Sequence, residues 1–408
     1  MQSLCRQNQL TAVVCLVLIS PMPALAAGDM HGMKMVIFEQ QSDNDTVLAV
    51  KSAQGNGAGK NLKMVVFDGG VGSQMPVTPM PKEYGRNISI PADDRAPAIL
   101  DAYPGKQRQE DRMQIKTYGE VGYRNDELKW NIAWPTGTPN IVSELQWYNV
   151  HSAVITGGTD ITIDNWQADG KISYGQIASG KNQDSDYAGD NRQDEFSRSY
   201  SSTNDGASID LSAGIGYHLN VGKRSSTPGL QLTPKAGYAF HTQQFNDSNG
   251  NLVISDQANA RKLIPGYNSP PPGNFSGLDS TYEGTWFGPW GGLTSELIFN
   301  ERFSLQASGE YHYVDYEGTA NWNLRSDFQH PKSFTHKSGG EGIVVSALAR
   351  YLLTPEWIIR LSVQYQDWQA NDKGKGRFNF ADNSVVESSF NEVEWQSYGI
   401  NLGVDYVF

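Results

Sequence analysis

The residues best suited to chemistry gather in an acidic stretch from Asn182 to Asp194, where Asp184, Asp186 and Asp190 stand among further Asn, Asp and Gly. Aspartates in such a segment cap turns or face water. Their carboxylates, together with amide and backbone oxygens, also suit calcium. The spacing of Asp184, Asp186, Asp190 and Asp194 lacks the fixed pattern of an EF-hand, so a solvated turn and a cation site both stay open.

A second group of candidate donors lies near the start of the chain. The segment Asp29–Met35, with Met75 and Met80 further on, offers thioethers and an imidazole that would suit copper. Residues so close to a chain end are usually disordered, which argues against a metal role. No phosphate-binding loop, metalloprotease helix or nucleophilic triad is present, and we expect no cofactor and no resident metal.

The first 26 residues have the three parts of a secretory signal peptide: the basic Arg6, the apolar run Leu10–Ile19 and the cleavage pattern Ala24-Leu-Ala26. The run is too short to span a bilayer as a helix. Both cysteines lie inside this segment, so the mature chain has none, which excludes disulfides, thiolate metal sites and cysteine nucleophiles. The formal charge of -12 argues against a nucleic-acid partner.

The mature chain divides into two regions. Residues 27–112 have weak periodicity and much Gly, Pro, Asp and Gln, and we expect a partly disordered periplasmic extension with a linker near 91–109. Residues 113–408 consist of alternating segments. In Tyr398–Phe408 the even positions are apolar and the odd positions are polar or small, as in a strand with one greasy face. A terminal aromatic such as Phe408 resembles the signal that outer-membrane assembly machinery reads.

The same alternation recurs along the whole second region, which predicts an all-β fold. It marks about ten segments, near 113–123, 141–156, 165–178, 206–220, 229–245, 281–298, 302–320, 342–353, 355–371 and 393–408. Short turns alternate with long polar loops, which we place at 179–205, 246–280, 321–341 and 372–392. We therefore expect a transmembrane, up-and-down antiparallel β-barrel of about ten strands in the outer membrane, with extracellular loops and both termini periplasmic.

A ten-stranded barrel is too narrow for a wide aqueous pore. Its inward positions are expected to hold polar groups that pair with each other and with water, or that form an ion path: Asp210, His218, Lys235, His241, Glu310, His312, Arg350, Arg360 and Asp405. The cluster Trp286, Phe287 and Trp290 is typical of an aromatic girdle at the membrane interface.

Short motifs then resemble a known family. Val142-Ser-Glu-Leu-Gln-Trp147, followed by a strand and by Asp184-Ser-Asp-Tyr187, resembles the omptins, ten-stranded outer-membrane endopeptidases. The chain is still more similar to the uncharacterised Protochlamydia outer membrane protein branch, in 182–191 and in 320–331. The resemblance covers about 113–408, strand for strand.

The resemblance implies a site in which an Asp pair faces an Asp-x-His dyad and water is activated between them. Asp184 and Asp186 match the Asp pair, and His330 matches the histidine. Phe328 stands where the family has the dyad aspartate, and Asp327 lies one residue further from His330. His330, followed by a proline, also fits an ordinary surface-loop histidine.

The broken dyad favours a non-catalytic barrel that serves in binding, adhesion or envelope structure. An omptin-related endopeptidase using Asp184, Asp186, His330 and Asp327 is the alternative. The partners that we expect are outer-membrane lipid, lipopolysaccharide as the resemblance implies, the assembly machinery at Phe408, and an extracellular peptide or protein.

Overall fold

The computed structural model describes residues 113–221 and 228–408. The predicted signal peptide and extension, with the Met- and His-containing segment, lie outside these residues. The described residues form one antiparallel sheet and a single short helix, α2 (Gln257–Leu263). The strands are β1 (Met113–Ile132), β2 (Ser143–Ile163), β3 (Trp166–Gly189), β4 (Gln193–Thr203), β5 (Ala207–Tyr217), β6 (Leu219–Val221), β7 (Gly229–Ser255), β8 (Gly273–Phe275), β9 (Ser280–Ile298), β10 (Phe303–Asn321), β11 (Phe334–Leu352), β12 (Trp357–Asn379) and β13 (Val385–Val407).

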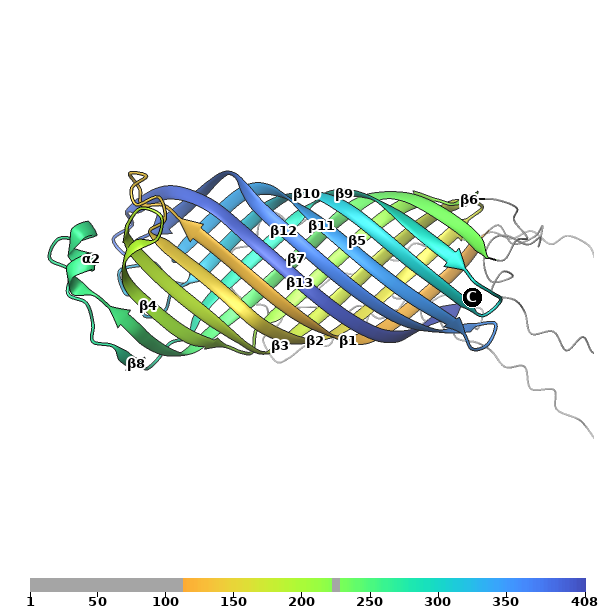
Figure 1. The fold of residues 1–408 in the computed structure, drawn as a ribbon, viewed down its shortest axis with the longest axis horizontal. Helices are drawn as coiled ribbons and strands as arrows, with labels where there is room; N and C mark the ends of the chain where they lie inside the picture. Colours follow the sequence, from red (N-terminus) through yellow and green to blue (C-terminus); the bar gives the residue numbers. More distant parts are fainter. Residues whose placement is uncertain (1–112, 222–227) are drawn as a thin grey trace, which may run out of the picture. The chain divides into compact units, whose positions relative to one another are not determined.

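The sheet closes into a barrel because β1 pairs with β2 on one side and with β13 on the other (Figure 1). β4 and β5 both pair with β3 and β7, so together they occupy one position in the ring. The three-residue strands β6 and β8 are additions to β7. Ten full positions remain, as predicted, and closure leaves neither edge of the sheet without a pairing strand.

The barrel has two different ends. The loop end carries the connections 133–142, 190–192, 256–279, 322–333 and 380–384, and the turn end carries 164–165, 299–302 and 353–356. The C-terminus lies at the turn end, where the backbone N–H of Phe408 donates to the carbonyl of Ile115 at 3.0 Å. Within the described residues, no helix has the length and apolar character to cross a bilayer.

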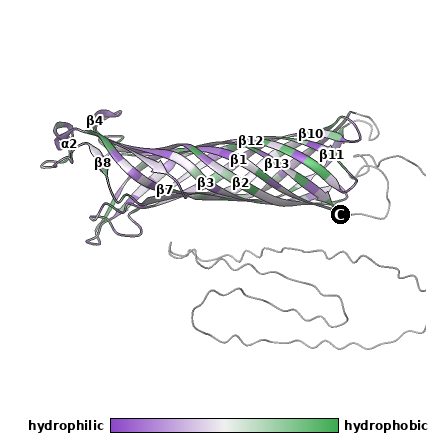
Figure 2. Cartoon of the chain, turned by 90° about the horizontal axis from the view of Figure 1, so that it is seen from below, coloured by the Kyte–Doolittle hydropathy of each residue, from purple (hydrophilic) through white to green (hydrophobic). Residues whose placement is uncertain are grey.

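The strands are longer than the alternation predicted. Two of the four segments expected as long loops, 179–205 and 372–392, mostly continue the barrel wall instead, and β12 alone has 23 residues. A membrane-spanning strand needs only about 9–11 residues. Toward the loop end the outer face of these strands is polar, which is why they resemble loops in the sequence; Figure 2 shows hydrophilic colouring concentrated there.

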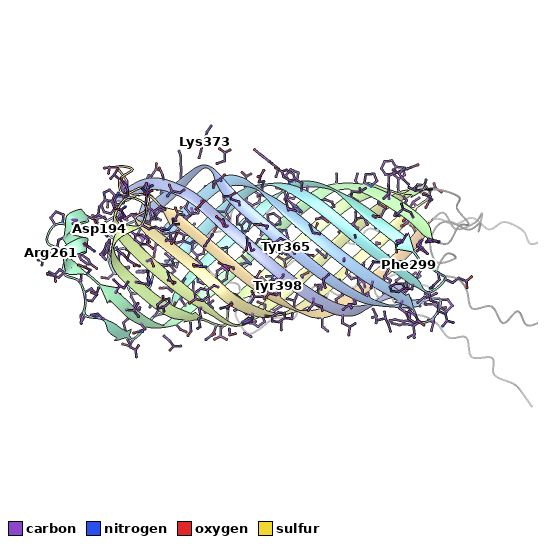
Figure 3. All side chains as sticks on the ribbon, viewed as in Figure 1. Asp194, Arg261, Phe299, Tyr365, Lys373 and Tyr398 are labelled. Carbon is purple, nitrogen blue, oxygen red and sulfur yellow. The ribbon has the colours of Figure 1, made fainter. Side chains whose placement is uncertain are left out.

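The outer wall near the turn end is a continuous apolar band. The predicted outward residues are exposed on it, with Tyr365 at 44% and Tyr398 at 57% (Figure 3). Exposed aromatic residues mark the two edges of the band. The edge toward the loop end carries tyrosines such as Tyr365 and Tyr398, and the edge at the turn end carries Phe299, Trp357 and Phe408. Aromatic edges of this kind lie at the two membrane interfaces of outer-membrane barrels.

Inside the band, the barrel holds a polar chamber of about 230 Å³. Most of its charged side chains are paired, as expected: Arg360 binds Glu120 at 2.8 Å and Asp405 at 2.7 Å, and Lys116 binds Asp160 at 2.9 Å. Buried charges need such partners, because an unpaired ion is costly away from bulk water. The predicted polar core is therefore confirmed.

Above the chamber, toward the loop end, the lumen is filled by apolar side chains that we call the aromatic plug. Its aromatic members are Trp130, Trp147, Phe245, Tyr282, Trp286, Tyr316, Phe328, Phe334, Trp368, Phe390 and Trp395. The expectation that Trp286 and Trp290 belong to an outer girdle is wrong, because they are only 0% and 5% exposed and point inward. β9 carries its large side chains on the inner face at this level, with Gly288 between them.

The plug should contribute much of the stability of the loop-end half. Trp368 is fully buried and stacks on Trp395 with ring centroids 5.5 Å apart. We expect Trp368→Ala to lower the free energy of unfolding by about 3–5 kcal/mol, because the lost ring leaves a cavity. Urea titration of refolded protein in detergent measures this.

The matched control is Trp357→Ala, since Trp357 is 45% exposed on the outer wall. The free energy of unfolding should fall less than half as much in Trp357→Ala as in Trp368→Ala. Equal losses in the two variants would contradict a packed plug.

Candidate functional site

Asp184 and Asp186 lie on β3 and not in a loop, so their assignment to a solvated turn is wrong. Asp184 stands opposite Leu145 of β2, and Asp186 stands opposite Ser143. Paired residues share one face of a sheet, and Leu145 belongs to the plug. Both carboxylates therefore lie on the inner face of the barrel wall near the loop end.

An irregularity in the β2–β3 pairing brings them there. The register shifts on both sides of His151, which pairs with Ser179, whereas the next residue, Ser152, pairs with Ile177. A bulge of this kind moves every later side chain to the opposite face. Without it, the inward set that begins at Asp169 would continue through odd positions, and both aspartates would point outward.

The electrostatics of this wall are unusual. Burial, together with the neighbouring carboxylates of Asp186 and Asp247, raises the pKa of Asp184 well above its usual value. Burial raises the pKa of Asp186 to about 6, against hydrogen bonds from Ser143 and the charge of Arg325. One oxygen of Asp184 is buried without a hydrogen-bond partner. The wall is thus acidic in composition and holds protons readily.

Asp247 on β7 is a third member of this wall that the sequence did not reveal. It accepts hydrogen bonds from Trp147 Nε1 at 3.1 Å and from the Thr203 hydroxyl at 2.6 Å. Burial raises its pKa to about 7. Asp247 falls in a segment expected to be loop, so only the length of β7 would have placed it on the inner face.

The residues proposed for the second dyad lie in the connection 322–333 but do not form one. Asp327 accepts two hydrogen bonds from Arg325, at 2.8 and 2.7 Å. The His330 ring is held by its own connection, with Nδ1 2.8 Å from Asn321 Oδ1 and Nε2 3.2 Å from the Arg325 carbonyl. Both ring nitrogens are engaged, and neither contacts Asp327.

Phe328 occupies the position of the dyad aspartate and is 7% exposed. Its ring lies 5.2 Å from that of Phe380 and 6.4 Å from that of Phe334. The position that would carry a carboxylate in an omptin is therefore part of the plug. From this connection, the charge that acts on the Asp pair is the Arg325 guanidinium.

The structure does not support the hypothesis that the acidic stretch 182–194 binds a cation. The Asp190 carboxylate accepts the backbone N–H of Asn140 at 2.8 Å, and Asp194 pairs with Lys262 at 2.8 Å. Within the described ranges, no cluster of three or more His, Cys, Asp or Glu has metal-binding geometry. These aspartates instead serve as hydrogen-bond partners between connections.

Asparagines join several connections of the loop end to their neighbours. Asn140 exchanges hydrogen bonds with Asn191 at 2.8 and 3.1 Å, which joins 133–142 to 190–192. Asn259 on α2 donates to the Glu195 carbonyl at 3.2 Å, which joins 256–279 to β4.

Further asparagine contacts complete this circuit. Asn323 donates to the Gly277 carbonyl at 2.6 Å and accepts from the backbone of Asp279 at 2.9 Å. Gln329 donates to Asn383 at 3.1 Å, and Asn391 on β13 donates to the Asn140 carbonyl at 2.8 Å. We call this closed set of contacts the asparagine rim. It ties each of these connections to a neighbouring connection or strand of the loop end.

A family model described as Protochlamydia outer membrane protein matches residues 118–408. Comparison with curated proteins found no match. Among solved structures, the outer membrane protease OmpT from Escherichia coli matches with a TM-score of 0.60 and 18% identity, covering 72% of this chain and 97% of that one. The resemblance to omptin-like barrels, and to the Protochlamydia family, is confirmed.

Two other outer-membrane proteins match more weakly. The translocator domain of the autotransporter NalP from Neisseria meningitidis has a TM-score of 0.28 and 10% identity, covering 74% of this chain and 90% of that one. OprG from Pseudomonas aeruginosa has a TM-score of 0.26 and 10% identity, covering 72% and 95%.

The raised pKa of Asp247 predicts a pH-dependent stability. Folded protein binds this proton more tightly than unfolded protein between about pH 4 and 7, so the free energy of unfolding falls as pH rises through that window. Asp247→Asn removes this term. Relative to wild type, the variant should gain on the order of 3 kcal/mol between pH 4 and 8, as measured by urea unfolding.

Asp194→Asn is the control, because Asp194 is an exposed residue of β4 near the loop end. Its stability difference from wild type should change less than that of Asp247→Asn over the same range, because water and salt screen an exposed carboxylate. A constant difference for Asp247→Asn would contradict the raised pKa of the Asp247 carboxyl.

Proposed function

Because the chain belongs to the Protochlamydia outer membrane protein family, it is an outer-membrane β-barrel in contact with membrane lipid, and we propose that it works by binding and without catalysis. The proposed ligand is an extracellular peptide or protein that contacts the loop end. A purely structural role in the envelope would use the same barrel but would need no ligand at the rim.

The observation that carries this proposal is the burial of Phe328 within the plug. An Asp-x-His dyad activates water because a carboxylate orients and charges the imidazole. Here the carboxylate position is a packed ring, Asp327 is neutralised by Arg325, and His330 is held by Asn321. The general base that peptide hydrolysis would need at neutral pH has no support at this position.

The asparagine rim supports binding at the loop end. Its connections are fixed to one another before any ligand arrives, so a partner does not have to order them. Ordering side chains and loops on binding costs free energy, and a preorganised surface avoids much of that cost.

The proposed orientation places the loop end outside the cell. An even number of strand positions returns both ends of the barrel to the same side, which agrees with β1 beginning and β13 ending at the turn end. In this proposal, residues 1–26 are a cleaved signal peptide and 27–112 a periplasmic extension. Phe408 then lies where assembly machinery would recognise the last strand.

An omptin-related endopeptidase remains the second candidate, and one observation favours it. Asp184 and Asp186 share the inner face near the loop end, and burial raises the pKa of both, as in paired carboxylates that exchange a proton. In this reading lipopolysaccharide on the outer wall would support activity, as the omptin resemblance implies.

Peptide cleavage separates the two candidates. We expect refolded wild-type protein with added lipopolysaccharide to leave a mixed peptide library intact, because both nitrogens of the His330 ring are engaged by Asn321 and the Arg325 carbonyl. Mass spectrometry of the library measures this, with folding checked by heat-modifiable gel mobility. Cleavage that disappears in Asp184→Ala and in His330→Ala would establish the endopeptidase instead.

The asparagine rim makes a separate prediction. Asn323→Ala removes the contacts of the 322–333 connection with Gly277 and Asp279. Amide hydrogen exchange in 276–280 and 322–326 should become at least tenfold faster, since the loops lose their mutual support. Asn249→Ala is the matched control, because the Asn249 side chain bonds to the adjacent Ser248 of its own strand. Unchanged exchange in Asn323→Ala would mean that the rim is not held by this residue.

A further inference from the structure

Three histidines lie within or against the aromatic plug. His241 and His312 are at its base, above the polar chamber, and His336 is at its centre; they are 6%, 1% and 0% exposed. Side chains this deeply buried normally satisfy all their polar atoms. Each of these rings instead has one nitrogen with a partner and one without.

Each of the three histidine rings has one hydrogen-bond partner. His241 Nδ1 lies 2.9 Å from Asp210, and its Nε2 has no partner. His312 Nε2 lies 3.1 Å from Glu310, and its Nδ1 has none. His336 Nδ1 lies 3.1 Å from the Tyr282 hydroxyl, and its Nε2 has none. A neutral imidazole needs one acceptor for its single N–H, so all three can be neutral at little cost.

The rings are structural members of the plug. His241 and His312 both contact Trp368, with centroids 4.9 and 4.7 Å apart. His336 stacks on Phe390 at 4.2 Å and meets the edge of Trp130 at 4.6 Å. Any change in the charge of these imidazoles therefore acts directly on the packing that fills the lumen.

The carboxylate beside His241 already has another cationic partner, and a lysine also acts on it. Asp210 also binds Arg124 at 2.6 Å, and Lys171 acts on both Asp210 and His241. The His241 and His312 ring centroids are 6.5 Å apart, so two imidazolium ions there would repel.

The other titratable groups beside these rings are Glu310, which faces His312, and two tyrosines next to His336. Glu310, beside His312, is also subject to the charges of Lys171 and Lys235. Next to His336, the Tyr282 hydroxyl is hydrogen-bonded both to the Tyr316 hydroxyl and to His336 Nδ1. Burial lowers the pKa of His336 to about 3.

We propose that the aromatic plug is an acid-sensitive closure, which seals the polar chamber from the loop end while its three histidines are neutral. Protonation adds a second N–H to each ring at the nitrogen that has no acceptor. It also places a positive charge among aromatic side chains, where charge is poorly solvated. Acid then loosens the plug, and small ions gain a path from the loop end to the chamber.

The pH direction follows from the histidines. Burial holds the pKa of His336 below the ordinary value of histidine, about 6.5, so its neutral ring favours the closed plug above that pH. That contribution is lost as pH falls below 6.5, progressively toward the lowered pKa of His336. The closure is therefore expected to hold at neutral pH and to fail in acid.

The test is ion conductance of the full-length mature protein in planar bilayers, between pH 7.5 and pH 4. A triple variant, His241→Asn, His312→Gln and His336→Asn, places an amide where each bonded ring nitrogen lies but cannot be protonated. We expect wild-type conductance to rise at least tenfold at pH 4, and the triple variant to change less than twofold. His218→Asn, on the chamber wall beside Thr233, should behave as wild type.

Two results would overturn the proposal. One is a wild-type protein that stays silent down to pH 4 while its folded gel mobility is retained. The other is a triple variant that opens as the wild type does. If the triple variant does not fold, the three single variants each carry the test, since each should shift the opening to lower pH. Tryptophan emission of wild type should move to longer wavelength over the pH range in which conductance rises, and unchanged emission there would also count against the proposal.

Discussion

Closure of the strand ring is the constraint on which the rest of this structure depends. A sheet surrounded by lipid has no water to satisfy an unpaired edge, so β1 must meet β13. Ten positions give a lumen just wide enough to be filled by side chains. The inner face of every strand is therefore committed to filling the space that closure creates.

The lumen is filled in two ways along its length. Within the apolar band, paired charges such as Arg360 and Asp405 surround a polar chamber. Toward the loop end, indole and phenyl rings replace them. Asp126 connects the two halves, because it binds Arg124 at 2.8 Å and accepts the Trp395 N–H at 2.9 Å. The same wall thus changes from ionic to aromatic packing without a break in the strands.

Alternation in the sequence predicted the outer wall well, because a lipid-facing position must be apolar and its neighbour need not be. Ile400 and Leu402, for example, are 49% and 56% exposed, as expected. The strands of the loop-end half could not be predicted from alternation, because their outer face is polar and their inner face aromatic. Segments such as 372–392 therefore resemble loops in the sequence. Periodicity also cannot locate bulges, and one bulge decides which way Asp184 points.

The candidate site was predicted in its parts but not in its arrangement. The sequence identified Asp184, Asp186 and the departure at Phe328, since these depend only on residue type and order. It did not identify Asp247 or Arg325, which reach the same wall from β7 and from the 322–333 connection. Contacts of that kind depend on tertiary structure and leave no local signal.

The asparagine rim has a consequence for how this surface changes over evolutionary time. Loops of membrane barrels are usually free to vary in length and sequence one at a time. Here a deletion near Asn140 removes support from the connection 190–192 and from β13 together. Surface drift must then proceed by matched substitutions in neighbouring loops. An antibody raised against the native protein would recognise a composite epitope, built from several loops, that no single linear peptide reproduces.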